Sequence, residues 1–393
     1  MAKSAAQDLL AQLVSFPVLG GQSNLSILAY IEEYLTAHGV TYQLVRNEAE
    51  QKASLHARIG PAVDGGIILS GHMDVVPTEG QDWHTDPFTL TEKDGKLYGR
   101  GSCDMKGFLA CVLAVVPQLV KANLQRPIYL AFSYDEEVGC VAAPELIQAI
   151  NNFYSEKPAY AIVGEPSLLQ PVVGQKGICV YRTTVHGSAG HSSRIRAEVS
   201  AIHEAARLVI WLEDYMNALV DSGHTDDRFD PNHTSLHCGK IKGGIAHNVI
   251  ADEASFLWDV RNIPRDRVED IHAAFIEHCA KQVTRLRQRF PAADIRTEMY
   301  HPLVPALDTP EHLAIVPLIR ELTGVQELQT VSYAAEAGQF AEGGFQSVIC
   351  GPGSIAQAHR ANEFISVEQL KKGVEFIERI MVHSCQQQAV LQS

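Results

Sequence analysis

The 393-residue sequence lacks long apolar runs, basic clusters and internal repeats. A helix that crosses a bilayer needs about 20 apolar residues in succession, and no stretch approaches that length. The formal net charge is −14, and the lysines and arginines do not cluster, which argues against nucleic acid or an anionic membrane as a partner. The composition predicts a soluble globular protein and leaves the charge of its substrate open.

Paired cysteines are also missing. The eight cysteines lie at positions 103, 111, 140, 179, 238, 279, 350 and 385, without a CxxC pattern. In a chain of this size, such spacing predicts reduced, mostly buried thiols and therefore a cytoplasmic protein. Residues 5–14 have the pattern of an amphipathic helix and lack the basic and apolar regions of a signal peptide, which agrees with that location.

The chain does have length and apolar content. Hydrophobic residues make up 46% of its 393 positions, which is enough for a sizeable core and for two domains. The first half alternates predicted helices with short strands, as an α/β protein does. The helices are expected at 5–14, 25–38 and 108–120, and the strands at 40–44, 53–59, 67–70, 128–134 and 160–163.

Two polar residues follow the apolar strand at 67–69. His72 and Asp74 come where this strand ends, and in open α/β sheets ligands bind at the carboxyl ends of the strands. A histidine followed by a carboxylate suits a metal ligand whose second ring nitrogen is held by that carboxylate. The alternative is a His and an Asp that only cap the strand and its turn, and so short a motif does not exclude it.

Asp104 lies between a glycine-punctuated loop and the apolar helix at 108–120. An Asp at a helix start is ordinarily an N-cap. A carboxylate held at such a junction can also bridge two cations, because its two oxygens can face two metals. Both interpretations remain open from this segment alone.

Three more carboxylates follow apolar strands. Glu136 and Glu137 come after the strand at 128–134, and Glu165 comes after the strand at 160–163. Adjacent carboxylates at the end of a buried strand repel each other and lose hydration, which is costly unless cations are present. On a surface loop the same pair would simply be solvated. If the strands are neighbours, these acids gather at one edge of the sheet.

A further apolar strand, 348–350, precedes the loop that carries His359. Two histidines added to these carboxylates make a mixed nitrogen and oxygen set, which suits a pair of zinc-like ions rather than calcium or a thiolate site. Such a pair lowers the pKa of a shared water and polarises a carbonyl. A spare glutamate beside a ligand glutamate could then carry the proton to a leaving amine.

Four motifs resemble, in the same order, those of the M20 family of dinuclear metallopeptidases and deacylases. They are GHMDVVP at 71–77, GRGSCDMKG at 99–107, DEEVG at 135–139 and GEP at 164–166. The resemblance covers nearly the whole chain. It implies a mixed-sheet, zinc-peptidase-like α/β catalytic domain that holds two divalent ions, Zn²⁺ with Co²⁺ as an alternative.

The resemblance also implies a role for each site residue. The implied ligands are His72 and Glu165 for one ion, Glu137 and His359 for the other, and Asp104 as the bridge. Glu136 would be the general base and Asp74 would orient His72. The peptide bond after Asp104 is commonly cis in this family.

Between residues 178 and 300 the predicted elements follow the order β-α-β-β-α-β. This order is ferredoxin-like, so we expect an α+β domain at 178–300 inserted into a discontinuous catalytic domain at 1–177 and 301–393. No metal-ligand set occurs in the insertion. Its expected work is closure as a lid, and the family resemblance implies that it also forms a homodimer.

Three residues of the lid match family positions that contact the substrate: His191, Asn248 and Arg261. An imidazole N–H and an amide are suitable donors to an oxyanion, and a guanidinium is the natural partner of a substrate carboxylate. Without the resemblance, the same residues are a turn histidine, a loop asparagine and a structural ion pair.

The segments 331–340 and 351–359 resemble the acetylornithine deacetylase branch of the family. That branch hydrolyses N2-acetyl-L-ornithine to L-ornithine and acetate in arginine biosynthesis. Glu336 would face the amine of this N-acyl amino acid, and Gly353 is expected to line the substrate site. Aminoacylases, succinyl-diaminopimelate desuccinylases and dipeptidases of the family remain alternatives, and a non-catalytic binding protein on the same fold is a remote one.

Overall fold

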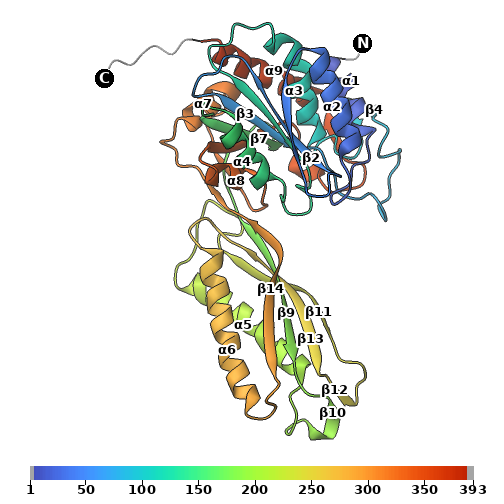
Figure 1. The fold of residues 1–393 in the computed structure, drawn as a ribbon, viewed down its shortest axis with the longest axis vertical. Helices are drawn as coiled ribbons and strands as arrows, with labels where there is room; N and C mark the ends of the chain where they lie inside the picture. Colours follow the sequence, from blue (N-terminus) through green and yellow to red (C-terminus); the bar gives the residue numbers. More distant parts are fainter. Residues whose placement is uncertain (1–3, 387–393) are drawn as a thin grey trace. The chain divides into compact units, whose positions relative to one another are not determined.

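The computed structural model describes residues 4–386, which form two compact units (Figure 1). Unit 1 comprises the described residues up to Gly174, Leu307–Gln329 and those from Ala335 onward, and unit 2 comprises Gln175–Ala306 and Thr330–Ala334. We expected the insertion at 178–300. Unit 2 extends further because strand β14 (Asp294–Val304) continues past residue 300.

Unit 1 contains most of the helices and strands among the described residues. Its helices are α1 (Ala5–Val14), α2 (Leu25–Ala37), α3 (Lys106–Leu119), α4 (Ala143–Phe153), α7 (Ile315–Thr323), α8 (Ala337–Glu342), α9 (Val367–Ser384) and the 3₁₀ helix at Ile355–Gln357. Its main sheet is built from β1 (Tyr42–Arg46), β2 (Ala53–Ile59), β3 (Ile67–His72), β6 (Ile128–Ser133), β7 (Tyr160–Pro166), β8 (Val172–Gln175), β15 (Leu307–Asp308), β16 (Gln329–Val331) and β17 (Gln346–Gly351). A small sheet is formed by β4 (Thr91–Lys93), β5 (Lys96–Tyr98) and β18 (Phe364–Ser366).

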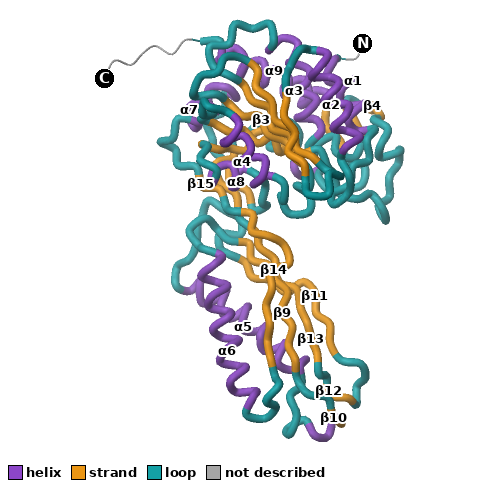
Figure 2. The backbone as a smooth tube through the Cα atoms, in the orientation of Figure 1, coloured by secondary structure: helices purple, strands orange, loops and turns teal. Residues whose placement is uncertain are grey.

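The main sheet is mixed, as expected. Its strands are ordered β1-β2-β6-β3-β7-β17-β8-β15, with β16 beside β8. The central strands β6, β3, β7 and β17 are parallel to their neighbours in this group, whereas β2 pairs antiparallel with β6. Every residue of β3 and β6 is buried, so both faces at the centre of the sheet are covered. Figure 2 shows helices on either side of these strands.

Two groups of helices pack on this sheet. Helices α1, α3 and α9 contact one another, and their apolar side chains share a core with Leu69 of β3 and Phe132 of β6. Helices α4 and α8 contact each other, and α8 also contacts β7 and β17. Helix α1 begins with a capping box in which Ser4 Oγ accepts from the Gln7 N–H and Gln7 Oε1 accepts from the Ser4 N–H. The layers hold the central strands rigidly at the position where the candidate site lies.

Unit 2 has the element order β-α-β-β-α-β. Its main elements are β9 (Ile178–His186), α5 (Ala201–Asp221), β11 (Ser235–Gly243), β13 (Glu253–Arg261), α6 (Val268–Arg287) and β14, and the shorter ones are β10 (Gly190–His191), a 3₁₀ helix at Ser192–Arg194 and β12 (Val249–Ile250). The larger sheet is antiparallel with the order β11-β13-β9-β14. Alternate residues of β9 and β13 are buried, and those side chains pack against α5 and α6. This is a ferredoxin-like arrangement with one covered face.

Within residues 4–386, none of the helices combines the length and the apolar character needed to span a membrane.

Candidate metal centre

The candidate site lies at one edge of the main sheet in unit 1. Because β3, β6, β7 and β17 are parallel, their carboxyl ends meet at the same edge. His72 is the last residue of β3 and is in register with Ser133, the last residue of β6. The chain then delivers Glu136 and Glu137 shortly after β6, and Glu165 is the last residue but one of β7. The loop after β17 leads to the remaining histidine.

Asp104 lies between the two histidines. Its Oδ1 is 3.2 Å from His72 Nε2, and its Oδ2 is 3.4 Å from His359 Nε2. Each of these imidazole nitrogens also faces a second carboxylate: Glu165 Oε1 is 3.7 Å from His72 Nε2, and Glu137 Oε2 is 3.0 Å from His359 Nε2. The structure therefore contains two sets of one imidazole and one glutamate that share the two oxygens of a single aspartate.

Asp74 connects the two sides of this cluster. Its main-chain oxygen is 2.8 Å from His72 Nδ1, whereas its nearest carboxylate oxygen is 3.6 Å away. The carboxylate accepts hydrogen bonds from the main-chain N–H groups of Glu136 and Glu137, at 3.2 and 3.1 Å. The main-chain carbonyl of Asp74 is therefore the nearer contact of the His72 ring, and the role of the carboxylate in orienting that ring stays a prediction.

Glu136 lies beside the ligand set and has a partner that we had not expected. Its Oε1 is 3.3 Å from the Sγ of Cys140, a thiol that the sequence identified only as buried. Ligand atoms of Glu136, His72 and Glu165 lie within 4.8 Å of one another. Burial raises the pKa of the Glu136 carboxyl well above its usual range, and the negative charges of Glu137 and Asp104 add to this rise. A carboxyl with a raised pKa and a neighbouring ligand set is suited to proton transfer.

The charges of the cluster indicate that it binds cations. Burial raises the pKa of Glu165 well above its usual range, and Glu165 Oε1 is a buried atom without a hydrogen-bond partner among residues 4–386. The hydrogen bonds from His359 to Asp104 and Glu137 raise the pKa of His359 to about 10. For His72 burial opposes protonation, yet the bonds to Asp104 and Asp74 raise its pKa well above the usual value.

The donor atoms fit divalent ions of the zinc class. Two imidazole nitrogens, one shared aspartate and two further carboxylates are the mixed ligands that such ions prefer. Among the described residues, groups of three or more potential ligands with converging atoms occur only at this sheet edge. The cis peptide bond expected after Asp104 is present between Asp104 and Met105.

Glu336 and Gly353 both lie in unit 1. The Glu336 side chain is fully buried before α8, with Oε2 3.3 Å from Ser70 Oγ, and burial raises the pKa of its carboxyl. Gly353 has φ +89°, and a Cβ there would lie 2.6 Å from the Sγ of Cys103, so this close approach of two loops requires glycine. Contact of either residue with a substrate stays a prediction.

The three remaining predicted residues belong to unit 2. His191 is exposed in β10, with Nδ1 2.8 Å from Ser193 Oγ. Asn248 is exposed in the loop before β12, and its main-chain oxygen accepts from the Ser192 N–H at 3.1 Å. Arg261 ends β13, with Nε 3.4 Å from Asp259 Oδ2. His191 and Asn248 are thus exposed, whereas Arg261 is partly buried, and contact of any of the three with a substrate stays a prediction.

Sequence reasoning gave no role to Glu363, which the structure places directly behind Asp104. Its carboxylate accepts hydrogen bonds from the main-chain N–H groups of Cys103 and Asp104, at 2.8 and 3.0 Å. The available signal was an acidic residue four positions after His359, just before strand β18. Nothing in that spacing reveals that main-chain groups of another loop are its partners.

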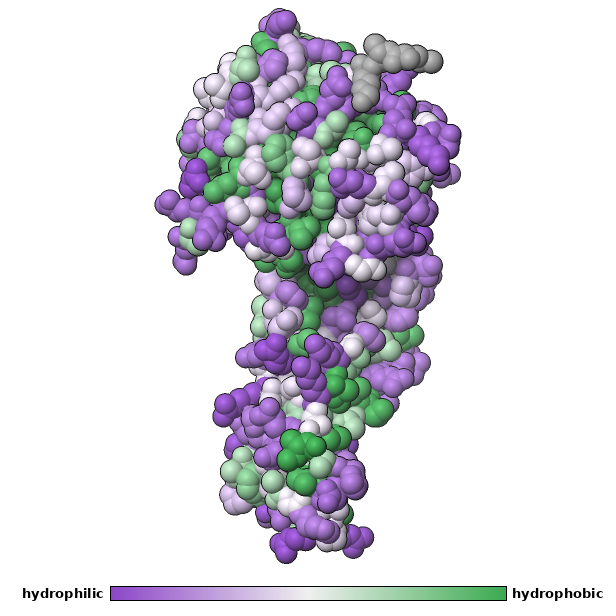
Figure 3. Space-filling model, turned by 90° about the vertical axis from the view of Figure 1, so that its right-hand side faces the viewer, coloured by the Kyte–Doolittle hydropathy of each residue, from purple (hydrophilic) through white to green (hydrophobic). Residues whose placement is uncertain are grey.

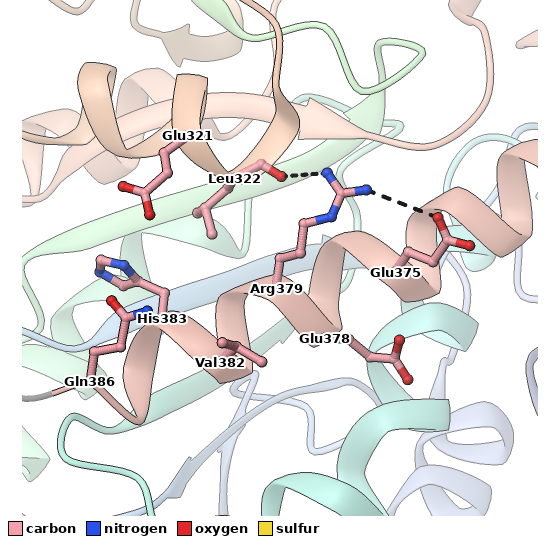
Figure 4. Close-up of a pocket in the computed structure, with 8 residues that line it drawn as sticks. All are labelled: Glu321, Leu322, Glu375, Glu378, Arg379, Val382, His383 and Gln386. Atoms are coloured by element: carbon pink, nitrogen blue, oxygen red, sulfur yellow. Dashed lines mark hydrogen bonds and ion pairs between the residues drawn. The ribbon is translucent and has the colours of Figure 1, made fainter.

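A groove elsewhere in unit 1 has a different character. It lies between α7 and α9, has a volume of about 460 Å³ and is drawn in Figure 4. Arg379 crosses it, with Nη1 2.9 Å from the Leu322 main-chain oxygen and Nη2 3.9 Å from Glu375 Oε2. The groove residues supply no converging ligand set of the kind found at the sheet edge among the described residues.

The whole chain is similar in sequence to known proteins. The sequence profile of "Peptidase family M20/M25/M40" matches residues 68–383. The chain is 32% identical to an acetylornithine deacetylase of Myxococcus xanthus over 388 residues, which cover 97% of this chain and 98% of that protein.

Solved structures of the family share the fold. An M20 family metallo-carboxypeptidase from Sulfolobus solfataricus superposes with a TM-score of 0.77 at 17% identity, over 98% of this chain and all (100%) of that one. A dinuclear metal-binding M20 peptidase from Bacillus subtilis gives a TM-score of 0.66 at 14% identity, over 96% and 97% of the two chains. The chain therefore belongs to peptidase family M20/M25/M40 and is a hydrolase that acts on amide bonds.

Proposed function

We propose that this protein removes the acetyl group from N2-acetyl-L-ornithine and releases L-ornithine and acetate. The proposal that the reaction depends on metal ions rests on the position of Asp104. Its two oxygens face two different imidazoles, each of which also faces a glutamate. The choice of substrate is supported by the 32% identity to the Myxococcus xanthus enzyme over nearly the whole length of both chains. The reaction would supply ornithine for arginine biosynthesis.

In this proposal two divalent ions, Zn²⁺ with Co²⁺ as a substitute, are held by the clustered ligands. His72 and Glu165 would hold one ion, Glu137 and His359 the other, and Asp104 both. When bound, such ions polarise a carbonyl and acidify a water.

Glu136 is proposed to transfer the proton during hydrolysis. Its carboxylate takes a proton from the attacking water, whose oxygen forms a new bond to the acetyl carbon. The same carboxyl then delivers the proton to the amine nitrogen as the C–N bond breaks, so that atoms and charges balance. Asp74 fixes the main chain of Glu136 through the 3.2 Å hydrogen bond to its N–H.

Unit 2 is proposed to supply donors to the substrate. The imidazole of His191 suits the oxyanion that forms as the water oxygen attacks, and the amide of Asn248 and the guanidinium of Arg261 suit the α-carboxylate. In unit 1, Glu336 is proposed to attract the substrate's amine, so Glu336→Gln should raise KM for cationic substrates without changing KM for neutral ones. Gly353 is proposed to line the site through its main chain.

A homodimer formed through unit 2 is also part of this proposal. Ile202, Ile241 and Ile245 are 40%, 52% and 88% exposed, and Ile202 lies against Gly243 and Gly244. Figure 3 shows hydrophobic side chains on the surface of this part of the molecule. A second copy that covers this patch would remove it from water. Sedimentation should then give twice the 43.0 kDa chain mass, and Ile245→Asp should give the single chain.

We further propose a cytoplasmic location, because all eight cysteines are free thiols and most are buried.

The deciding experiment is a substrate panel with metal-loaded protein. We expect kcat/KM for N2-acetyl-L-ornithine to exceed that for N-succinyl-diaminopimelate, for other N-acetyl amino acids and for dipeptides. A higher kcat/KM for another member of the panel would make that compound the proposed substrate. The assignment as an amide hydrolase would not change. Hydrolysis that does not depend on added Zn²⁺ or Co²⁺ would contradict the two-metal proposal itself.

A further inference from the structure

Arg100 and Glu363 form an ion pair in the interior of unit 1. Both side chains are 1% exposed, and Arg100 Nη1 is 2.8 Å from Glu363 Oε2. Glu363 Oε2 also accepts from the Gly101 N–H at 3.0 Å, and Oε1 accepts from the N–H groups of Cys103 and Asp104. One carboxylate thus holds the guanidinium and three N–H groups of the loop that ends at the shared aspartate.

The guanidinium of Arg100 reaches other segments of the site. Its Nη1 donates to the Arg360 main-chain oxygen at 3.2 Å, and its Nη2 donates to the Pro77 main-chain oxygen at 3.4 Å and to Gln81 Oε1. The amide of Gln81 in turn donates to the main-chain oxygen of His359 at 2.9 Å. The pair therefore links the loop after β3, the loop before α3 and the loop that carries His359.

A buried ion pair is a weak source of stability, because the loss of hydration offsets most of the attraction between the charges. An apolar pair of similar size would fill the same space at similar or lower cost. The Glu363 carboxylate, however, accepts four directed hydrogen bonds, which an apolar side chain cannot do. These bonds set the orientation of the main chain at Asp104. His359 has φ +61°, a conformation that an L-residue holds only when its surroundings fix it.

We infer that Glu363 and Arg100 are positioning residues that hold Asp104 and His359 in the arrangement that binds two metal ions. This inference rests on the two-metal function proposed above and deepens it. Both side chains contact the loop backbone, and their effect passes through it, as that of residues behind metal ligands commonly does.

The test is Glu363→Gln, measured by titrating Co²⁺ into chelator-treated protein. Glutamine keeps the shape of the Glu363 side chain but places an NH₂ group against N–H donors of the loop that ends at Asp104. We expect this loop to shift. We expect Co²⁺ affinity to fall by about 10- to 100-fold, the Co²⁺ absorption spectrum to change, and kcat to fall more than KM rises. The matched control is Glu156→Gln, a buried carboxylate that contacts Arg58 and the hydroxyl of Tyr129 and precedes β7 instead of following it. It should lower the thermal midpoint without changing Co²⁺ affinity.

Each outcome decides one claim. Unchanged Co²⁺ affinity and spectrum in Glu363→Gln, with wild-type protein binding two ions, would overturn the positioning role alone. Failure of wild-type protein to bind Co²⁺ would overturn the proposed function instead. Should Glu363→Gln not fold, Gln81→Ala decides, because it leaves Glu363 in place and removes the side chain that joins Arg100 to the His359 main chain, together with the acceptor of the Trp83 N–H. We expect about tenfold weaker Co²⁺ binding from it, and unchanged binding would contradict the inference.

Discussion

The sheets of the two units place their polar groups differently. In unit 1, strands β3 and β6 are buried along their whole length, and their imidazole and carboxyl groups come only at or after the strand ends. In unit 2, strands β9 and β13 alternate buried and partly exposed residues, so polar groups are spread over one face. A parallel sheet covered on both faces concentrates charge at one edge, whereas an antiparallel sheet with one open face offers a broad surface for recognition.

The largest expected effect comes from the shared carboxylate of unit 1. Asp104→Asn replaces one of the two oxygens that face His72 and His359 by an amide nitrogen, which is a poor ligand for zinc-class ions. We expect hydrolysis to fall below detection and the bound metal to drop from two ions per chain. Metal analysis of the dialysed protein and an acetate-release assay measure both. If Asp104→Asn still binds two ions tightly, Asp104 is not the ligand that the two ions share.

Glu136→Ala separates proton transfer from metal binding at the same edge. Because Glu136 is proposed as base and not as ligand, both ions should stay bound while kcat falls by about 10²- to 10⁴-fold. Single-turnover kinetics with metal analysis of the same sample provide the measurement. Substantial remaining kcat would refute the assignment of the base, and loss of metal would reassign Glu136 to the ligand set, where its atoms lie within 4.8 Å of those of His72 and Glu165.

His191→Ala tests whether unit 2 contributes to the chemistry or only to binding. Removal of one donor to a developing oxyanion lowers kcat by about 10²-fold, whereas removal of a purely ground-state contact raises KM. We expect the change in kcat, with two ions still bound in unit 1. Ser193→Ala is the matched control, because it removes the 2.8 Å neighbour of the His191 ring and leaves the imidazole in place. Equal kcat in His191→Ala and wild type would restrict unit 2 to recognition.

The smallest expected effect concerns a histidine of unit 1 outside the site. His56 on β2 is buried, with Nδ1 3.0 Å from the Tyr154 hydroxyl, and burial lowers its pKa to about 4. In the unfolded chain the imidazole takes a proton near pH 6.5, so its contribution to stability is full above pH 6.5 and is lost as the pH falls towards 4. The loss is at most on the order of 3 kcal/mol.

Urea unfolding between pH 7.5 and 4 measures this loss. The dependence on pH should be weaker in His56→Gln than in wild type, while His203→Gln on the exposed surface of α5 should match wild type. The same slope in His56→Gln would show that the acid sensitivity of the fold comes from other groups.

The strand ends of unit 1 could be predicted from the sequence because hydrophobic runs and acidic residues are both visible in it. A run such as 67–69 is long enough for a buried strand, and a parallel sheet brings the residues after such strands to one edge. The convergence of His72, Glu137 and Glu165 follows from this rule. The order of elements in unit 2 was equally accessible, because its strands alternate polar and apolar residues and its helices are long.

Main-chain partners could not be predicted in this way. The contact of His72 with the Asp74 carbonyl and the three N–H groups bound by Glu363 depend on loop conformation, and every residue type carries the same main-chain groups. The burial of Glu336 is a similar case, because the residue precedes a short helix whose packing no local pattern reveals. Pro302 favours a strand end near residue 300, but β14 lies at the edge of its sheet, where a proline is tolerated, and it continues to Val304.

Asp74 has a consequence for how this enzyme can change. Its carbonyl steadies His72 while its carboxylate steadies the peptide groups of Glu136 and Glu137, so one side of the residue serves a metal ligand and the other serves the proposed base. A shift of this residue moves both together. Affinity for the ions and the rate of proton transfer therefore both depend on this residue. A substitution at position 74 that alters one should also alter the other.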